Sequence, residues 1–256
     1  MKNSQLQSRL IRSLLFLIAL MSGFYLRAAE LSVAVAANFA APIQKIATAF
    51  EQDTGHKANI SFGSTGKFYT QIRNGAPFQV LLAADAETPA KLEQEGFAEV
   101  GTQFTYAIGK LVLWSKQASF VDDKGEVLRR GNFDHIAIAD PKLAPYGLAA
   151  MQALAQIGLD KSITPKVVWG ENISQTFLYV DSKAASLGFV ALSQVLKDGV
   201  IKEGSVWVLP TSMYASIRQD AILLKEGKTN PAAVTFLKYL RSPKSQEIIR
   251  SFGYSF

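Results

Sequence analysis

The sequence predicts an α/β fold built as two similar lobes with mainly parallel sheets. Three observations support this prediction. Short β-type runs alternate with amphipathic helical segments along the chain, a pattern that is typical of parallel sheets because each helix returns the chain to the next strand. The length of 256 residues allows two lobes, since domains average roughly 100–200 residues. The composition, with 48% hydrophobic and 19% charged residues, is that of a folded globular protein.

The N-terminal segment, residues 1–29, has the pattern of a secretory signal peptide. It contains basic residues and no acidic ones, and residues 14–26 (LLFLIALMSGFYL) are almost continuously apolar. A basic region followed by about 7–15 apolar residues is typical of an export signal. This run is shorter than the roughly 20 residues that a membrane-spanning helix needs. We therefore expect export to the periplasm with cleavage near Ala28 or Ala29, and an uncleaved membrane anchor is the alternative.

The composition excludes several function classes. Four of the 27 Lys and Arg residues lie in the predicted signal, so the rest of the chain carries 23 basic residues against 21 acidic ones. With no strong basic run, we expect no nucleic-acid partner. The chain has no Cys, which excludes disulfides, iron–sulfur clusters and a thiol nucleophile. With only His56 and His135, we expect neither a His-rich metal site nor a cofactor.

The first third of the chain predicts three strands, each followed by a helix. The strands are residues 31–37, 57–62 and 78–85. The helix after the first strand has apolar residues at spacings of four, three and four, which places them on one face. These residues are Phe39, Ile43, Ile46 and Phe50.

The middle of the chain continues this alternation, with strands at 135–140, 167–170 and 187–192 and two helices near 231–240 and 243–252 at the end. The segment 104–115 reads as one long strand that passes between lobes, and 205–210 is a strand by which the chain can return.

This arrangement divides the mature chain into a discontinuous first lobe and a continuous second lobe. We expect lobe 1 to comprise residues 30–106 plus 211–256, and lobe 2 to comprise residues 107–210.

Small polar residues stand at four predicted strand-to-helix junctions. Asn38 fits an N-cap after the first strand, and Ser64 and Thr65 precede the second helix between two glycines. Tyr146 opens a helix after two prolines, and Ile173 opens another after Asn172.

Each junction offers the same chemistry. The first N–H groups of a helix have no internal partner and the dipole is positive at that end, so an anion fits there. In α/β sheets such junctions lie at the carboxyl ends of the strands, where ligands bind. Four converging junctions would surround an oxyanion with neutral donors. Alternatively, each residue only caps its own helix, and the pattern by itself does not show that the four converge.

Two further patterns have catalytic alternatives. Ser64 and Lys67 match the S-x-x-K of penicillin-recognising serine enzymes, although S-D-N and K-T-G partners are missing. An exported serine hydrolase that uses Ser64 and Lys67 is thus an alternative function. Asp85 and Asp140 end strands and are either paired carboxylates or caps of the following turns.

From residue 31 to 256 the chain resembles the periplasmic molybdate-binding proteins of ABC importers. The segments that carry the resemblance cover most of this region in the family's order. They are VAVAANFAAP, SFGSTGKFYTQIRNGAPFQVLLAAD, IAIADPKLAPYG, ENISQ, LGFVALSQV and KSQEIIRSFGY.

The resemblance implies a binding protein and not an enzyme. It implies two lobes joined by a two-segment hinge, with molybdate or tungstate bound in the cleft by hydroxyl, amide and main-chain N–H groups and without a Lys or Arg salt bridge. It also implies a monomer that delivers its anion to a membrane permease. The alternative within the binding class is a receptor for another tetrahedral oxyanion, such as sulfate or phosphate.

By motif, the resemblance assigns five residues to the oxyanion site. Asn38 stands where many members have serine, and Thr65 stands at the second serine with Ser64 beside it. Tyr146 and Ile173 stand at positions that give main-chain N–H groups, so mild effects of Ala substitutions are expected there.

The chain departs from the family pattern at one position. Ala191 occupies the place where some members have a tyrosine hydroxyl on the anion. The side chains of Tyr146 and Asn38 are the candidates to replace that donor.

Overall fold

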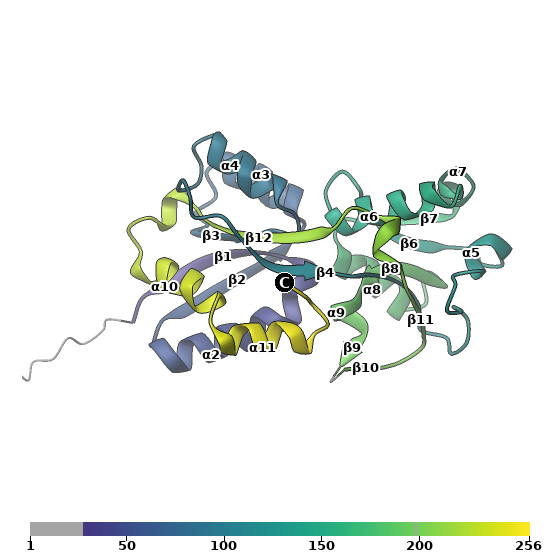
Figure 1. The fold of residues 1–256 in the computed structure, drawn as a ribbon. Coiled ribbons are helices and arrows are strands. Elements are labelled where there is room, and N and C mark those ends of the chain that lie inside the picture. Colours follow the sequence, from purple (N-terminus) through teal and green to yellow (C-terminus); the bar gives the residue numbers. More distant parts are fainter. Residues whose placement is uncertain (1–27, 198) are drawn as a thin grey trace, which may run out of the picture.

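The computed structural model describes residues 28–197 and 199–256, which form two α/β units side by side along the long axis of the molecule (Figure 1). Each unit is built on a five-stranded sheet with helices packed against it. The strand order is β2-β1-β3-β12-β4 in the first sheet and β11-β5-β8-β6-β7 in the second. The predicted α/β class with two lobes is confirmed.

The first unit contains the beginning and the end of the described chain. Its strands are β1 (Glu30–Ala36), β2 (Lys57–Gly63), β3 (Val80–Leu82), β4 (Phe104–Gly109) and β12 (Ile217–Leu223). Its helices are η1 (Ala37–Phe39), α2 (Ala40–Thr54), α3 (Thr65–Arg73), α4 (Glu87–Gln94), η4 (Lys225–Gly227), α10 (Pro231–Leu240) and α11 (Pro243–Ser251). The predicted apolar face of α2 is fully buried in its core, with Phe39 just before the helix.

The second unit is continuous in sequence. Its strands are β5 (Leu111–Ser115), β6 (Ile136–Ala139), β7 (Val167–Gly170), β8 (Leu187–Ala191) and β11 (Ser205–Val208), with a small hairpin of β9 (Leu196–Lys197) and β10 (Val200–Ile201). Its helices are α5 (Val127–Arg130), α6 (Pro145–Gln156), α7 (Asp160–Ile163), η2 (Thr164–Lys166), α8 (Ile173–Asp181) and α9 (Leu192–Val195). The short η3 (Thr211–Met213) lies on the return path to β12.

The prediction of one long strand over 104–115 is wrong. The run is interrupted at Lys110, so that β4 pairs in the first sheet and β5 in the second. The residues are apolar on both sides of the break, and β-type composition alone gives no sign that the strand changes sheets. The predicted strand over 78–85 is also shorter than expected, because only Val80–Leu82 pair as β3.

The expectation of mainly parallel pairing is also corrected, because both sheets are mixed. β1 pairs in parallel with β2 and β3, and β6 pairs in parallel with β7 and β8. The strands next to the crossings run the other way: β12 is antiparallel to β3 and β4, and β5 is antiparallel to β8 and β11.

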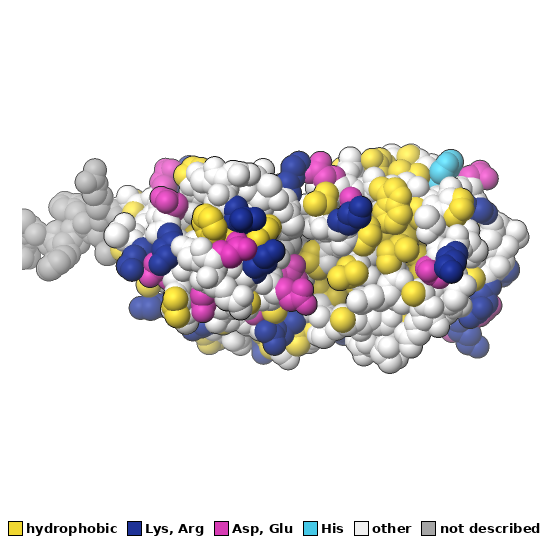
Figure 2. All heavy atoms as spheres, turned by 90° about the horizontal axis from the view of Figure 1, so that it is seen from above, with side chains coloured by type: hydrophobic (Ala, Val, Ile, Leu, Met, Phe, Trp, Pro, Cys, Tyr) yellow, Lys and Arg dark blue, Asp and Glu magenta, His cyan; other side chains and the backbone are white. Residues whose placement is uncertain are grey.

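The surface of the described part carries side chains of both charges. Figure 2 shows basic and acidic side chains interspersed over the face it presents, with hydrophobic side chains gathered on part of the second unit. Among the described helices, none combines the length and the apolar character needed to span a membrane. The predicted signal peptide lies outside the described residues, except for Ala28 and Ala29 at its end.

Candidate functional site

The N-termini of four helices, two from each unit, meet around one small cavity. All five residues that the sequence predicts line it: Asn38, Ser64, Thr65, Tyr146 and Ile173. The cavity has a volume of about 10 Å³, which is room for one water-sized group. Among the described residues that line it, none is charged. The cavity is therefore suited to a small solute held by neutral groups.

Ser64 offers an unused hydroxyl to this cavity. It occupies the N-cap position of α3 in an extended conformation and is only 3% exposed. Its side chain makes no capping hydrogen bond, and its Oγ is buried without any partner among the described residues. Because an unpaired buried hydroxyl costs roughly 1–3 kcal/mol, Ser64 is a donor held ready for a ligand.

Thr65 offers a second hydroxyl whose orientation is fixed. It is 1% exposed, and its Oγ1 accepts a hydrogen bond of 2.9 Å from the Ala84 N–H. A hydroxyl that accepts one bond still has its proton to donate. The bond to Ala84 thus holds Thr65 with its proton free for a cavity ligand.

The second unit contributes backbone N–H groups at α6. Pro145 is the first helical residue and has no N–H, and the Gly147 and Leu148 N–H groups bond to the Ala144 carbonyl at 2.9 and 3.1 Å. The N–H of Tyr146, which lies between Pro145 and Gly147, is therefore the first free donor of the helix. A Cβ on Gly147 would lie 2.1 Å from the Ala139 carbonyl oxygen, so only glycine lets α6 begin this close to β6.

The start of α8 is arranged in the same way. The Asn172 side chain caps the helix and accepts from the N–H groups of Ser174 and Gln175, each at 3.0 Å. This leaves the Ile173 N–H at the cavity, where the positive end of the helix dipole also favours an anion. Asn172 lines the cavity as well, and its capping role matches the sequence prediction.

The prediction for Asn38 needs correction. Asn38 lies inside η1, whose N-cap is Ala36, so it caps nothing. Its Nδ2 donates to Gln219 Oε1 at 2.8 Å and to the Tyr254 hydroxyl at 3.0 Å. The side-chain amide N–H groups therefore point into the protein behind η1, and Asn38 has its backbone N–H to offer an anion.

Of the two side chains expected to replace the missing tyrosine donor, the Asn38 amide donates to residues outside the cavity lining, and the Tyr146 hydroxyl lies against Gln219 and Gly109, which are also outside it. The Asn38 amide is used as described, and the Tyr146 hydroxyl accepts from Gln219 Nε2 at 3.2 Å. Burial raises the pKa of the Tyr146 phenol well above its ordinary value. Ala191 itself is buried and its N–H donates to Gln194 Oε1. The site thus relies on two hydroxyls and on backbone N–H groups.

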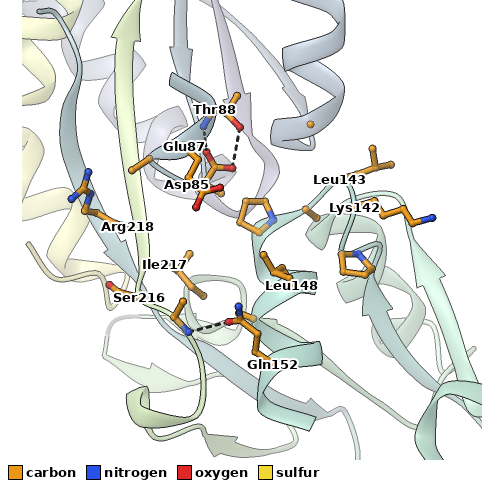
Figure 3. A pocket seen from close by; sticks show the side chains of 18 residues that line it. Asp85, Glu87, Thr88, Lys142, Leu143, Leu148, Gln152, Ser216, Ile217 and Arg218 are labelled. Carbon is orange, nitrogen blue, oxygen red and sulfur yellow. Dashed lines mark hydrogen bonds between the residues drawn. The ribbon is translucent and has the colours of Figure 1, made fainter. Parts of the chain in front are cut away.

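A wider groove between the two units opens next to the cavity (Figure 3). It has a volume of about 520 Å³ and shares three lining residues with the cavity, namely Ala84, Ala144 and Pro145. Asp85 and Arg218 lie on the first unit's side of the groove, and Lys142 and Leu148 lie on the other. The groove is thus the approach from solvent to the cavity.

The two carboxylates that end strands act as caps, as the simpler alternative predicted. Asp85 accepts from the N–H and the hydroxyl of Thr88 at 2.8 and 3.2 Å, and Asp140 accepts from the Lys142 N–H at 2.9 Å. Burial raises the pKa of the Asp85 carboxyl, while the bonds from Thr88 partly oppose that rise. The described residues contain no group of three or more His, Cys, Asp or Glu placed to hold a metal ion.

The geometry does not support the serine-hydrolase alternative. Lys67 Nζ forms an ion pair with Glu171 of the opposite unit, and the Ser64 hydroxyl has no partner. A nucleophilic serine needs its base within hydrogen-bond reach, and that contact is missing between Ser64 and Lys67.

Direct hydrogen bonds join the two walls of the cavity. The Gly66 N–H donates to the Leu143 carbonyl at 2.9 Å, and Ser174 Oγ donates to the Ala37 carbonyl at 3.2 Å. A Cβ on Gly66 would lie 3.1 Å from the Leu143 Cα, so glycine allows the close approach of the two units. The structure is therefore a closed arrangement of the two walls.

Two units that close on a small uncharged cavity define a solute-binding protein. The chain belongs to the bacterial extracellular solute-binding proteins, whose family model matches residues 31–255.

Individual relatives agree with this class. The chain is 55% identical over 228 residues to the molybdate-binding protein ModA of Azotobacter vinelandii, covering 89% of this chain and 90% of the relative. It is 48% identical over 240 residues to ModA of Rhodobacter capsulatus, covering 93% of each. The solved structure of the Azotobacter vinelandii periplasmic molybdate-binding protein superposes with a TM-score of 0.86 and 41% identity, covering 88% of this chain and 99% of that one.

Proposed function

We propose that this protein binds molybdate in the cavity between its two units and delivers the anion to an ABC importer. The observation that carries the proposal is the buried Ser64 hydroxyl without a partner, beside Thr65 and three further helix N-termini. The choice of molybdate is supported by the two relatives named as molybdate-binding proteins at 55% and 48% identity. The protein is a receptor and catalyses no reaction.

The chemistry of the site suits a fully deprotonated oxyanion. Molybdate is a dianion at neutral pH and accepts hydrogen bonds without donating any. Two hydroxyl protons and the N–H groups of Asn38, Tyr146 and Ile173 are donors, and their dipoles act strongly in a dry cavity where the dielectric is low. The smaller sulfate would fail to reach all donors, at a cost of roughly 1–3 kcal/mol for each unpaired one. Tungstate is close to molybdate in size and binds similarly.

Binding involves movement of the two units as lobes. The cavity of about 10 Å³ has room for one water-sized group, so a four-oxygen anion requires the walls to separate slightly. The expected boundaries are residues 30–106 plus 211–256 for lobe 1 and residues 107–210 for lobe 2. Because β4 continues to Gly109 in the first sheet, we take the first hinge segment at Lys110 and the second between β11 and β12. Lobe 1 contributes three of the donors and lobe 2 contributes two, so closure completes the site.

The proposed location and partners follow from the same class. The chain is exported to the periplasm by residues 1–29, acts there as a monomer without a cofactor, and docks on the membrane permease of the importer. Neither nucleic acid nor a metal cation takes part.

Isothermal titration of the anion-free protein tests the proposal. We expect tight one-to-one binding of molybdate and tungstate and little heat from sulfate or phosphate. A preference for sulfate or phosphate would replace the proposal by the alternative oxyanion receptor. No binding of any of the four anions would remove the oxyanion function altogether.

A further inference from the structure

A buried glutamine connects the two walls of the cavity from behind. Gln219 on β12 is fully buried, and its Oε1 accepts from Asn38 Nδ2 at 2.8 Å. Its Nε2 donates to the Tyr146 hydroxyl at 3.2 Å. Asn38 belongs to the wall of the first unit and Tyr146 to that of the second, and both line the cavity. One side-chain amide thus bridges the two residues between which the ligand would sit.

The orientation of this amide follows from its neighbours. Gln219 Oε1 accepts from Asn38 Nδ2 and lies 3.1 Å from the Tyr106 hydroxyl, whose one proton has the Ala83 carbonyl as a second acceptor at 3.1 Å. Gln219 Nε2 faces the Tyr146 hydroxyl. The pairing of β12 with β4 shifts register between Gln219 and Asp220, and an irregularity of this kind re-aims side chains. Local structure therefore directs Gln219 into the space between the units.

Gly109 leaves the room that the bridge needs. It is the last residue of β4, next to the first crossing between the units. A Cβ at this position would lie 2.1 Å from the Tyr146 hydroxyl and 2.7 Å from Gln219 Nε2. The contact between Gln219 and Tyr146 thus depends on a glycine at the crossing.

Tyr254 adds a second connection at the same place. Figure 1 shows the C-terminal end of the chain between the two sheets. The Tyr254 hydroxyl lies 2.8 Å from the Asn38 carbonyl oxygen and 2.9 Å from Ser193 Oγ, and Ser193 Oγ donates to the same carbonyl at 2.9 Å. Asn38 is on the first unit and Ser193 on α9 of the second, so this cluster also spans both units.

We propose that Gln219 is a positioning residue that sets the separation of the two cavity walls and so determines which size of oxyanion the site prefers. Tyr254 supports it by holding η1 against the second unit. The inference rests on the proposed anion-binding function and extends it to residues that do not touch the ligand. With the bridge removed, the walls lose their fixed distance, and the donors no longer favour one size of anion over another.

Titration of Gln219→Leu with molybdate and sulfate tests this inference. Leu fills similar space without polar atoms. We expect the affinity for molybdate to fall at least tenfold and the ratio of molybdate to sulfate affinities to fall by at least the same factor. If Gln219 only supported folding, its substitution would lower the folded fraction. Both apparent affinities would then fall by the same factor, and their ratio would stay unchanged.

The matched control is Gln79→Leu. Gln79 is half-buried, and its Oε1 accepts from the Ser32 N–H at 3.2 Å and from Asn230 Nδ2 at 2.9 Å, all within the first unit. We expect this variant to keep the wild-type ratio even where its melting temperature falls. If Gln79→Leu changed the ratio as much as Gln219→Leu, the assignment to Gln219 would be overturned.

Tyr254→Phe keeps the test decisive if Gln219→Leu does not fold. It removes one hydroxyl from the same cluster, and we expect it to lower the ratio at least threefold. Its control is Tyr239→Phe, because the Tyr239 hydroxyl donates to Asp53 within the first unit.

The outcomes separate the two proposals. In one outcome the wild-type protein binds molybdate, and both Gln219→Leu and Tyr254→Phe keep the ratio of molybdate to sulfate affinities within twofold of the wild type. This result would overturn the role of Gln219 and leave the proposed function standing. A wild-type protein that does not bind molybdate overturns the proposed function, and the positioning role with it.

Discussion

The two walls of the cavity present donors of different kinds. The first unit offers side-chain hydroxyls from Ser64 and Thr65, at the start of α3. The second unit offers the N–H groups of Tyr146 and Ile173, at the starts of α6 and α8. A side-chain donor is lost in a single substitution, whereas a backbone donor survives as long as its helix begins at the same residue. Anion binding therefore depends on the identity of the side chains in the first wall, whereas in the second wall it depends on the backbone geometry at the start of each helix.

The largest effect is expected on the first wall, from Thr65→Ala. This change removes a donor to the anion and also leaves the buried Ala84 N–H without its acceptor. We expect the molybdate affinity to fall tenfold or more in calorimetric titration. Thr65→Ser keeps the hydroxyl and is expected to stay within threefold of the wild type. Equal losses in both variants would show that the methyl group matters and the hydroxyl does not.

A smaller effect, on stability, is expected at the groove that leads to both walls. Burial raises the pKa of Asp85, so folding favours the neutral form of this carboxyl. As the pH rises above 3.8, the ordinary pKa of the group, its growing negative charge lowers the free energy of unfolding. Asp85→Asn keeps an oxygen for Thr88 and removes the charge. We expect a melting temperature a few degrees above wild type at pH 7, and no difference below pH 3.8. A constant difference across this range would assign the effect to the capping geometry.

The smallest effect on affinity is expected on the second wall, from Ile173→Val. The N–H of residue 173 and the Asn172 cap are unchanged, so molybdate affinity should stay within twofold. Loss of one buried methylene should lower the free energy of unfolding by about 0.5–1.5 kcal/mol, which denaturant titration measures. A tenfold loss of affinity would show that this wall binds through its side chains as well.

The sequence expectation that Ala substitutions are mild on the second wall does not hold for Tyr146. Its ring is 2% exposed and its hydroxyl contacts Gln219, so Tyr146→Ala creates a cavity and removes a connection between the units. The motif identifies the backbone role of this residue. It carries no information about the side chain, because the partner is 73 residues away in sequence.

Local patterns predicted much of the cavity lining because helix starts are local features. Ser64, Tyr146 and Ile173 stand where glycine, proline and Asn172 mark the beginning of a helix. Long-range contacts had no such signal. Asn38 looked like a helix cap, yet its side chain bonds to Gln219 and Tyr254, which follow it by 181 and 216 positions in the sequence. Gln219 and Tyr254 were missed for the same reason. Gln219 lies outside the segments that carry the resemblance, and the KSQEIIRSFGY segment contains Tyr254 without indicating its contacts.

The sequence pattern indicated a passage between lobes within residues 104–115, but it did not show that the strand breaks at Lys110. Apolar β-type residues continue on both sides of Lys110, and strand propensity does not report which sheet a strand joins. A signal was present in Gly109, although its meaning depends on the Tyr146 hydroxyl that would collide with a Cβ there.

The most direct test of the account is Ser64→Ala, followed by molybdate titration and thermal unfolding. The Ser64 hydroxyl bonds to no other described residue, so its removal should not lower the melting temperature. The account predicts that molybdate affinity falls at least fivefold in this protein of undiminished stability. An unchanged affinity would contradict the account, because the hydroxyl would then be buried beside the cavity without serving the anion.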